Sequence, residues 1–252
     1  MQHAFGSGLL YGIPLTDSSG AAISNPTPVR FGTLQEVSID ISFDVKQLYG
    51  QNQFPVAVGR GKGKLSGKAK FAQLNGALIN SLFFGQTLNS GIIKAVNDTT
   101  GAVIPASPYQ VTPTGAEAGT WALDLGVINS SGNPLTRVAS APATGQYSVS
   151  AGVYTFAAAD TGQTVFINYR YTATSTSAKK MTITNQPLGY IPSFQVEFNA
   201  NYNGKQFLIS LPNAISNKLA FSTKLDDFMV PEFDFEGFAD ASGNVMTIAS
   251  AE

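Results

Sequence analysis

The residue types that most often perform catalysis are scarce in this chain. Its 252 residues include one histidine, His3, and no cysteine. A nucleophilic triad needs a positioned base, and most zinc sites need histidine or cysteine ligands. The chain has too few of these residues to build either kind of site. We therefore expect His3 to be an ordinary terminal residue. We also expect the protein not to be an enzyme and to use no cofactor and no catalytic metal.

Carboxylates are more numerous, but their spacing is that of a sheet surface. Six of the 16 acids lie between residues 226 and 240, and Glu232, Asp234 and Glu236 alternate. A period of two places side chains on one face of a strand, whereas a glycosidase needs two acids that converge across a cleft. Calcium is not excluded, although no loop has the ligand spacing of a calcium-binding hand. The row is either a solvated strand face or an acidic wall that repels a passing polyanion.

A basic segment, residues 60–70, contains five of the 15 lysines and arginines. The overlapping run 59–64, with glycines at 59, 61 and 63, superficially resembles a phosphate-binding loop, but the spacing differs and no helix follows directly. The bases stand at even positions, which predicts one face of a strand. Such a face could bind nucleic acid, or it could pair with acids on a neighbouring strand. We follow the second interpretation.

The segment 34–71 must position these charges. Apolar residues alternate with polar ones from Val37 to Val45, which predicts a strand with one apolar and one polar face. Pairing this strand antiparallel with residues 60–70 would set an acidic row opposite the basic row. The acids of that row are Glu36, Asp40 and Asp44.

The connection between these two strands, residues 47–59, is too long for a tight hairpin. It contains Tyr49, Phe54 and Pro55. Aromatic loops of this length usually have a function.

Composition predicts a β-rich protein that assembles with copies of itself. Apolar residues make up 43% and charged residues only 12%, with 25 glycines and 13 prolines. A formal net charge of −1 gives little electrostatic protection against self-association. No apolar run has the length of a membrane helix, and the N-terminus lacks the pattern of a signal peptide, so we expect a protein made and kept in a cytoplasm.

The predicted organisation is a core interrupted by a β-rich insertion at residues 105–180. The core comprises residues 1–104 and 181–252, with an N-terminal arm over about 1–30 and a helix over about 71–84. Apolar residues at three- and four-residue spacing favour that helix, and Gly85 would end it. The insertion has strand candidates at 121–127, 146–149, 153–156 and 164–171.

The C-terminal part predicts a hairpin around Asn203-Gly204, a strong turn signal. Strands are expected at 194–198 and 207–211, the second ended by Pro212-Asn213. Two further strands are expected at 219–225 and 232–238.

Two segments together resemble bacteriophage tail tube (major tail) proteins. They are residues 31–72, FGTLQEVSIDISFDVKQLYGQNQFPVAVGRGKGKLSGKAKFA, and 225–245, LDDFMVPEFDFEGFADASGNV. The resemblance implies a mainly β fold, a tail-tube-type sandwich or barrel with one flanking helix. It implies a structural virion protein whose hexameric rings stack into the tube through which the genome is delivered.

The same resemblance implies roles for particular residues. Glu232, Asp234 and Glu236 would line the lumen, with Glu36, Asp40 and Asp44 as further candidates. The loop formed by Tyr49, Gln51, Asn52, Phe54 and Pro55 would contact the next ring or the neighbouring subunit.

The implied partners are copies of the chain and the terminator, baseplate and tape-measure proteins of a tail, with a sheath if the tail is contractile. Genome DNA would pass without sequence-specific binding, and no membrane partner is implied. The location would be the virion tail, assembled in the bacterial cytoplasm. The alternatives are another β-rich virion component, such as a head-decoration or baseplate protein, or a carbohydrate-binding module.

Overall fold

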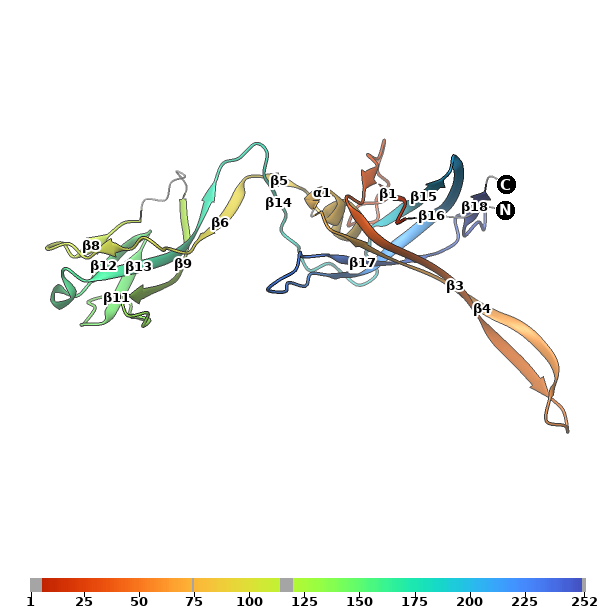
Figure 1. Ribbon diagram of the computed structural model, residues 1–252, viewed down its shortest axis with the longest axis horizontal. Helices are drawn as coiled ribbons and strands as arrows, with labels where there is room; N and C mark the ends of the chain where they lie inside the picture. The colour runs from red at the N-terminus through yellow and green to blue at the C-terminus, as the bar shows by residue number, and fades with distance from the viewer. Residues whose placement is uncertain (1–5, 74, 114–119, 251–252) are drawn as a thin grey trace. The chain divides into compact units, whose positions relative to one another are not determined.

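Figure 1 shows the fold in a computed structural model that describes residues 6–73, 75–113 and 120–250. The chain is mainly β, with 53% of residues in strands and 5% helical, which confirms the predicted fold class at this level. It divides into two compact units. The first unit is Met1–Leu88 with Met181–Glu252, and the second unit is Asn89–Lys180.

The first unit is built on one eight-stranded antiparallel sheet. Its order is β2-β1-β15-β16-β17-β4-β3, and β18 pairs with β16 beside that path. The strands are β1 (Leu9–Pro14), β2 (Val29–Arg30), β3 (Leu34–Tyr49), β4 (Pro55–Phe71), β15 (Ser193–Tyr202), β16 (Lys205–Ala220), β17 (Glu232–Gly237) and β18 (Thr247–Ser250). The predicted N-terminal arm therefore contributes two strands to the sheet, because β1 pairs with β15 along its whole length.

The helical segment is shorter than the predicted 71–84. Strand β4 continues to Phe71, and the helical residues are α1 (Gly76–Ile79) followed by one π-helical turn, η1 (Asn80–Phe84). The Asn75 side chain caps the start by accepting hydrogen bonds from the backbone of Ala77 and Leu78. As expected, Gly85 ends the segment in the left-handed conformation, with φ of 59°.

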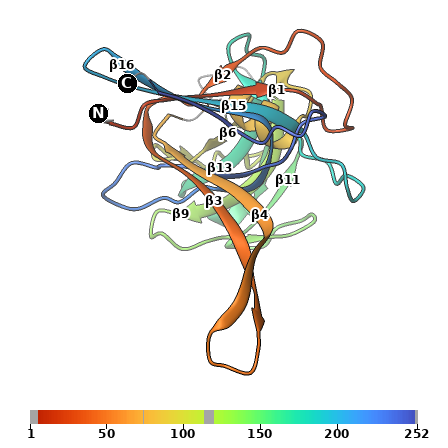
Figure 2. The same cartoon turned by 90° about the vertical axis from the view of Figure 1, so that its right-hand side faces the viewer.

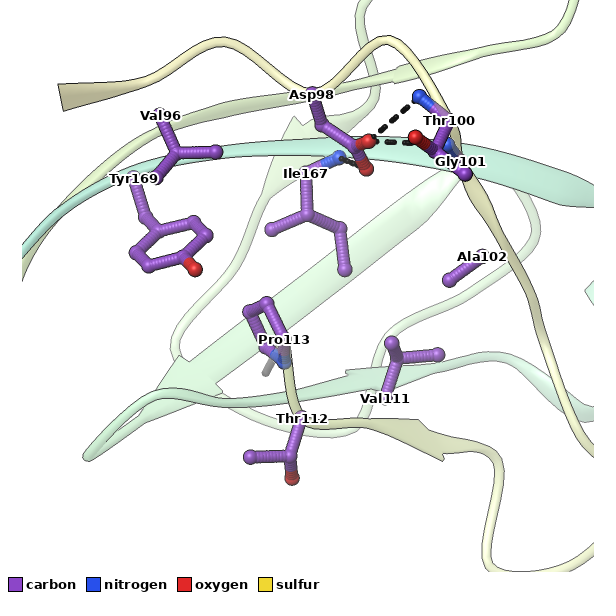
Figure 3. A pocket seen from close by; sticks show the side chains of 10 residues that line it. All are labelled: Val96, Asp98, Thr100, Gly101, Ala102, Val111, Thr112, Pro113, Ile167 and Tyr169. Carbon is purple, nitrogen blue, oxygen red and sulfur yellow. Dashed lines mark hydrogen bonds between the residues drawn. The ribbon is translucent and has the colours of Figure 1, made fainter. Parts of the chain in front are cut away.

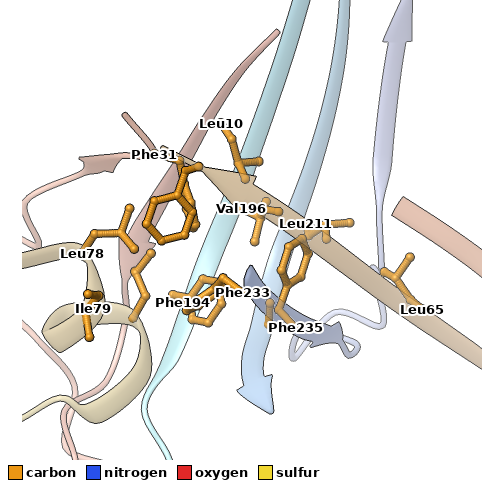
Figure 4. Close-up of a cluster of buried hydrophobic side chains, with 14 residues drawn as sticks. Leu10, Phe31, Leu65, Leu78, Ile79, Phe194, Val196, Leu211, Phe233 and Phe235 are labelled. Carbon is orange, nitrogen blue, oxygen red and sulfur yellow. The ribbon is translucent and has the colours of Figure 1, made fainter. Parts of the chain in front are cut away.

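The core of the first unit is a cluster of phenylalanine and aliphatic side chains between the helical segment and the sheet (Figure 4). Phe233 and Phe235, from β17, are fully buried, and so is Phe194 from β15. The Phe233 ring lies 5.4 Å from that of Phe31 and 5.8 Å from that of Phe194. Phe233 and Phe235 alternate with the acids of β17, so this strand packs on the core with one face and presents the acids to water on the other.

Strand β16 corrects two predictions. Pro212 was expected to end a strand, and 219–225 to form another, but β16 runs unbroken to Ala220 and residues 221–231 form a loop. The register with β15 shifts by one residue at 212–213. A β-bulge leaves a residue outside the ladder, so a proline without an N–H is accommodated there. The Asn203-Gly204 hairpin turn is confirmed, with φ of 50° and 76°.

The second unit contains two four-stranded sheets and a short ribbon. The orders are β10-β11-β12-β8 and β6-β13-β7, with β9 on β13, and β14 pairs with β5. The elements are β5 (Asn89–Ser90), β6 (Ile92–Val96), β7 (Ala102–Val103), β8 (Gln110–Val111), β9 (Thr120–Asn129), β10 (Thr136–Arg137), β11 (Gln146–Ser150), β12 (Val153–Phe156), the 3-10 turn η2 (Ala158–Asp160), β13 (Thr164–Ala173) and β14 (Lys179–Lys180).

All four strand candidates of the predicted insertion are present, as β9, β11, β12 and β13. The second unit begins at Asn89, whereas the predicted insertion begins at 105. The difference arises because β6 and β7 pair with β13 and so join its sheet. Within the part of the chain that the structure describes, no helix is long and apolar enough to span a membrane.

Candidate assembly surface

The β3–β4 hairpin projects from the first unit (Figure 2). Strand β17 pairs with β4 only over residues 65–70, so residues 55–64 of β4 have β3 as their sole partner strand among the described residues. At about 3.3 Å per residue, these ten residues extend roughly 30 Å beyond the sheet. On its other side, β3 is an edge strand with no described neighbour.

One face of the projecting hairpin is apolar and uncovered. Ile41, Phe43 and Val45 are 50%, 41% and 60% exposed, although Ile41 lies opposite the buried Leu65. An open groove of about 600 Å³ lies at the base of this face. It is lined by Ile41, Phe43, Gly63, Lys64, Leu65, Gly237, Phe238, Ala239 and Val245. The apolar surface of the core thus continues outward onto a hairpin that no described residue covers.

A β-bulge changes the predicted basic row. The register shifts between Phe43 and Val45, so that Val45 lies opposite Arg60. Arg60 consequently leaves the row of lysines, and its guanidinium lies 4.3 Å from the centroid of the Phe43 ring. A strict period of two had placed Arg60 with Lys64 and Lys68, and the bulge makes that placement wrong.

The other face of the sheet holds the remaining charges, in rows that alternate in sign between strands. Lys70 pairs with Glu36 across the β3–β4 ladder at 2.6 Å, which confirms the predicted pairing of the two rows at that position. Lys68 and Lys64 instead face Ser38 and Ser42 on β3.

The acids that neutralise those two lysines come from β17. Lys68 lies 2.9 Å from Glu232, and Lys64 lies 3.1 Å from Glu236. From β16, Lys218 binds Glu232 at 2.6 Å. The polar face is therefore a lattice of ion pairs across four strands, in which β17 contributes more of the acids than β3.

Glu232 is the centre of this lattice. Hydrogen bonds donated by Lys218 and Lys68 lower the pKa of Glu232 to about 2, and donation to Glu232 raises the pKa of Lys68. The neighbouring Asp234 differs, because its Oδ1 is buried without a hydrogen-bond partner among the described residues.

Acid should weaken the first unit through Glu232. The unfolded carboxyl has a pKa of about 4.3, and the folded one about 2. A carboxyl whose pKa is lower in the folded state stabilises the fold at pH values above its unfolded pKa. This stabilisation is lost as the pH falls through the folded pKa. We expect the difference in unfolding free energy between the original chain and Glu232→Gln to shrink between about pH 4.3 and pH 2. Urea unfolding across that range measures it, and a constant difference would contradict the pairing.

The structure brings together five of the six predicted lumen acids. Glu36, Asp40, Asp234 and Glu236 line one shallow depression of about 440 Å³ on the polar face, and Glu232 lies on the same row of β17. Asp44 lies farther out, on the projecting part of β3, where it has no ion pair with a described residue.

The predicted contact loop forms the exposed tip of the hairpin. Phe54 is 80% exposed and Tyr49 is 56% exposed. Gln51 and Asn52 are also exposed, and Pro55 begins β4 opposite Tyr49. The Tyr49 hydroxyl donates to the Gln47 side chain, so the tip makes local contacts while its aromatic rings remain in water.

Sequence reasoning missed two contributors to this surface. Asn217 and Lys218 both reach the acids of β17, at Glu236 and Glu232, because a bulge separates them in the ladder. Neighbouring strand residues normally occupy opposite faces, so alternation gives no such signal. The loop 221–231 was also missed, because part of it was expected to be strand; Leu225 and Phe228 in it are 98% and 88% exposed.

The second unit has a pocket of about 430 Å³, and the carboxylate that lines it already accepts hydrogen bonds from the backbone (Figure 3). Asp98 lines it but accepts hydrogen bonds from the backbone of Thr100, Gly101 and Ile167. Those bonds lower the pKa of Asp98 against the opposing effect of its burial, which is the largest single influence. The role of Asp98 is therefore to fix a turn beside β13.

A buried carboxylate elsewhere in the second unit is also satisfied. Asp124 accepts hydrogen bonds from the hydroxyls of Tyr147 and Tyr154 at 2.7 and 3.1 Å, and Arg137 approaches it at 3.7 Å. Burial, followed in Tyr147 by the bond to Asp124, raises the pKa of both tyrosines. The cluster binds the two sheets of the second unit together.

The described residues contain no group of three or more histidines, cysteines and acids that could hold a metal ion. Compared with protein-family models, the sequence matches none, and a comparison with curated proteins likewise gives no match.

Proposed function

We propose that the chain is the subunit of a bacteriophage tail tube, which assembles into hexameric rings that stack into the conduit for the genome. The observation that supports this most is the β3–β4 hairpin, amphipathic and projecting, with an open edge along β3. In a single soluble molecule, a long uncovered edge and an exposed apolar face favour aggregation. In a closed ring, each edge pairs with the next subunit and the apolar face is buried.

The polar face suits the wall of a channel for DNA. Its ion pairs hold Lys64, Lys68 and Lys70 against acids of the same sheet, which reduces the attraction of the lysines for phosphates. A wall of balanced charge would let a polyanion slide without binding. In this proposal the lumen contains Glu36, Asp40, Asp44, Glu232, Asp234 and Glu236, but it is less acidic than those residues alone suggest.

The remaining assignments follow from the same proposal. The protein would be located in the virion tail, with other tail proteins as partners and no catalytic activity. Negative-stain electron microscopy of the purified chain over a range of concentrations tests the proposed assembly into rings and tubes. Rings or tubes of uniform width are the expected result, and a monomer at all concentrations would contradict the proposal.

A further inference from the structure

The pocket of the second unit contains a polar group that has no partner in its own chain. Tyr169, on β13, lines the pocket and is only 5% exposed. Its hydroxyl makes no hydrogen bond with a described residue, and Figure 3 shows it directed into the space beside Ile167 and Pro113. Buried tyrosine hydroxyls usually have a hydrogen-bond partner. The free hydroxyl therefore indicates a place for a bound molecule.

Most of the pocket wall around this hydroxyl is apolar. Val96, Val111, Pro113 and Ile167 contribute to it, and the volume is about 430 Å³. Small-molecule sites are typically clefts of roughly 300–1,000 Å³ with mainly apolar walls and a few polar groups that fix the orientation of the ligand. The size and the lining of this pocket thus suit a small ligand that has an apolar face.

Asp98 offers a second polar contact in the same pocket. A carboxylate has about four acceptor positions, and the backbone bonds that hold the turn use three of those of Asp98. One position is left for a ligand. Burial, followed by the negative charge of Asp98, raises the pKa of Tyr169, so the tyrosine hydroxyl stays protonated and can donate. The pocket therefore presents one acceptor and one hydroxyl that can donate.

These two groups distinguish between classes of small molecule. No lysine, arginine or histidine is among the described residues that line the pocket, so the charge of Asp98 would repel an anion. An ammonium group has only donors and would leave the Tyr169 proton without an acceptor. Two neighbouring hydroxyls of a sugar meet both requirements, because one can donate to Asp98 while the other accepts from Tyr169. The C–H face of the sugar ring would lie on the apolar wall.

We propose that the second unit binds a neutral mono- or disaccharide in the pocket lined by Tyr169 and Asp98. The inference goes beyond the proposed tube function and does not depend on it, because every residue that lines the pocket belongs to the second unit. It assigns saccharide recognition to a unit none of whose described strands joins the sheet of the first unit.

Saturation-transfer-difference NMR of the full chain tests this inference in any state of assembly. The probes are the methyl glycosides of glucose, galactose, mannose, rhamnose and N-acetylglucosamine, with tetramethylammonium as the cationic probe. Each is used at about 10 mM, which would nearly saturate a site with a Kd of about 1 mM. We expect transfer to the ring C–H protons of at least one glycoside and none to the cation.

Two results of this experiment would overturn the inference. The first is the absence of transfer to every glycoside, and in a chain that forms tubes it would leave the proposed function intact. The second is transfer to tetramethylammonium that equals or exceeds transfer to the glycosides, which would make the pocket a site for an organic cation.

Substitutions in the pocket test where the sugar binds. Tyr169→Phe removes only the free hydroxyl and should weaken glycoside binding about three- to tenfold. Ala102→Leu places a larger side chain in the pocket and should abolish binding. The matched control is Tyr171→Phe, because Tyr171 is 6% exposed on the same strand but does not line the pocket; this variant should bind like the original chain.

Circular dichroism checks that each variant is folded, and only folded variants are compared. Glycoside binding that is unchanged in both Tyr169→Phe and Ala102→Leu would overturn the assignment to this pocket. An equal loss in Tyr169→Phe and Tyr171→Phe would also overturn it, because the effect would then not be specific to the free hydroxyl.

Discussion

Replacing Phe54 with Asp is expected to leave a folded, soluble subunit that no longer forms tubes where the unchanged chain does. Phe54 is 80% exposed and contributes little to the core, so the first unit should keep its stability. In the proposed assembly, burial of a phenylalanine ring would contribute about 2 kcal/mol, equivalent to roughly a 30-fold change in affinity. A carboxylate at the same place would add a desolvation cost.

Two substitutions distinguish the effect of losing the aromatic ring from the effect of adding a negative charge. Phe54→Tyr keeps an aromatic ring, and Gln53→Asp adds a carboxylate one residue away, so both should assemble better than Phe54→Asp. Sedimentation and electron microscopy measure the assembled fraction, and circular dichroism checks the fold. Full-length tubes of Phe54→Asp at unchanged yield would show that the hairpin tip is not an assembly contact.

Replacing Phe233 with Ala is expected to cost the first unit about 3–5 kcal/mol of unfolding free energy. Phe233 is fully buried, and its ring neighbours those of Phe31, Phe83, Phe194 and Phe235. The cavity would lie where the helical segment meets the sheet.

Phe238→Ala, at a residue that is 43% exposed just after β17, is the matched control and should cost no more than about 1 kcal/mol. The two units have separate cores, and the only tryptophan, Trp121, lies in the second unit. Its fluorescence transition should therefore change little in Phe233→Ala, while the circular dichroism transition of the sheet moves to lower denaturant. Equal shifts of both signals would mean that the units unfold together.

Alternation was the most informative feature of the sequence. The run from Val37 to Val45 and the row from Glu232 to Glu236 each predicted a strand with one apolar and one charged face, and both are present. In β17 the reason is that one face of the strand lies on the core and the other in water, which requires a period of two. In the outer part of β3 the same period gives an apolar face whose residues Ile41, Phe43 and Val45 are exposed in the single chain.

Bulges account for most of what the sequence could not predict. One extra residue in the ladder moves Arg60 to the other face of β4 and lets β16 continue through Pro212. Another lets Asn217 contact the acids of β17 on the same face as Lys218. A bulge has no reliable signal in a single sequence, since it is stabilised by contacts with distant strands. The requirement for Gly67 is similar: a Cβ there would lie 2.2 Å from the Phe235 ring, which only the packed structure reveals.

The candidate assembly surface was predictable in part. The tip residues and the acid rows could be proposed from residue types, but the lysines that neutralise Glu232 could not be paired with it without the strand order β16-β17-β4. Residues 219–225 were predicted to form a strand, so the loop 221–231 and its exposure became evident only in the fold.

A cryo-electron microscopy map of the assembled chain tests the central claim most directly. We expect a closed ring of six copies in which the free edge of β3 hydrogen-bonds to a strand of the neighbouring copy and the polar face of β3, β4 and β17 lines the channel. An assembly in which the edge of β3 faces solvent, or in which the ion-pair lattice lies on the outer surface, would contradict it.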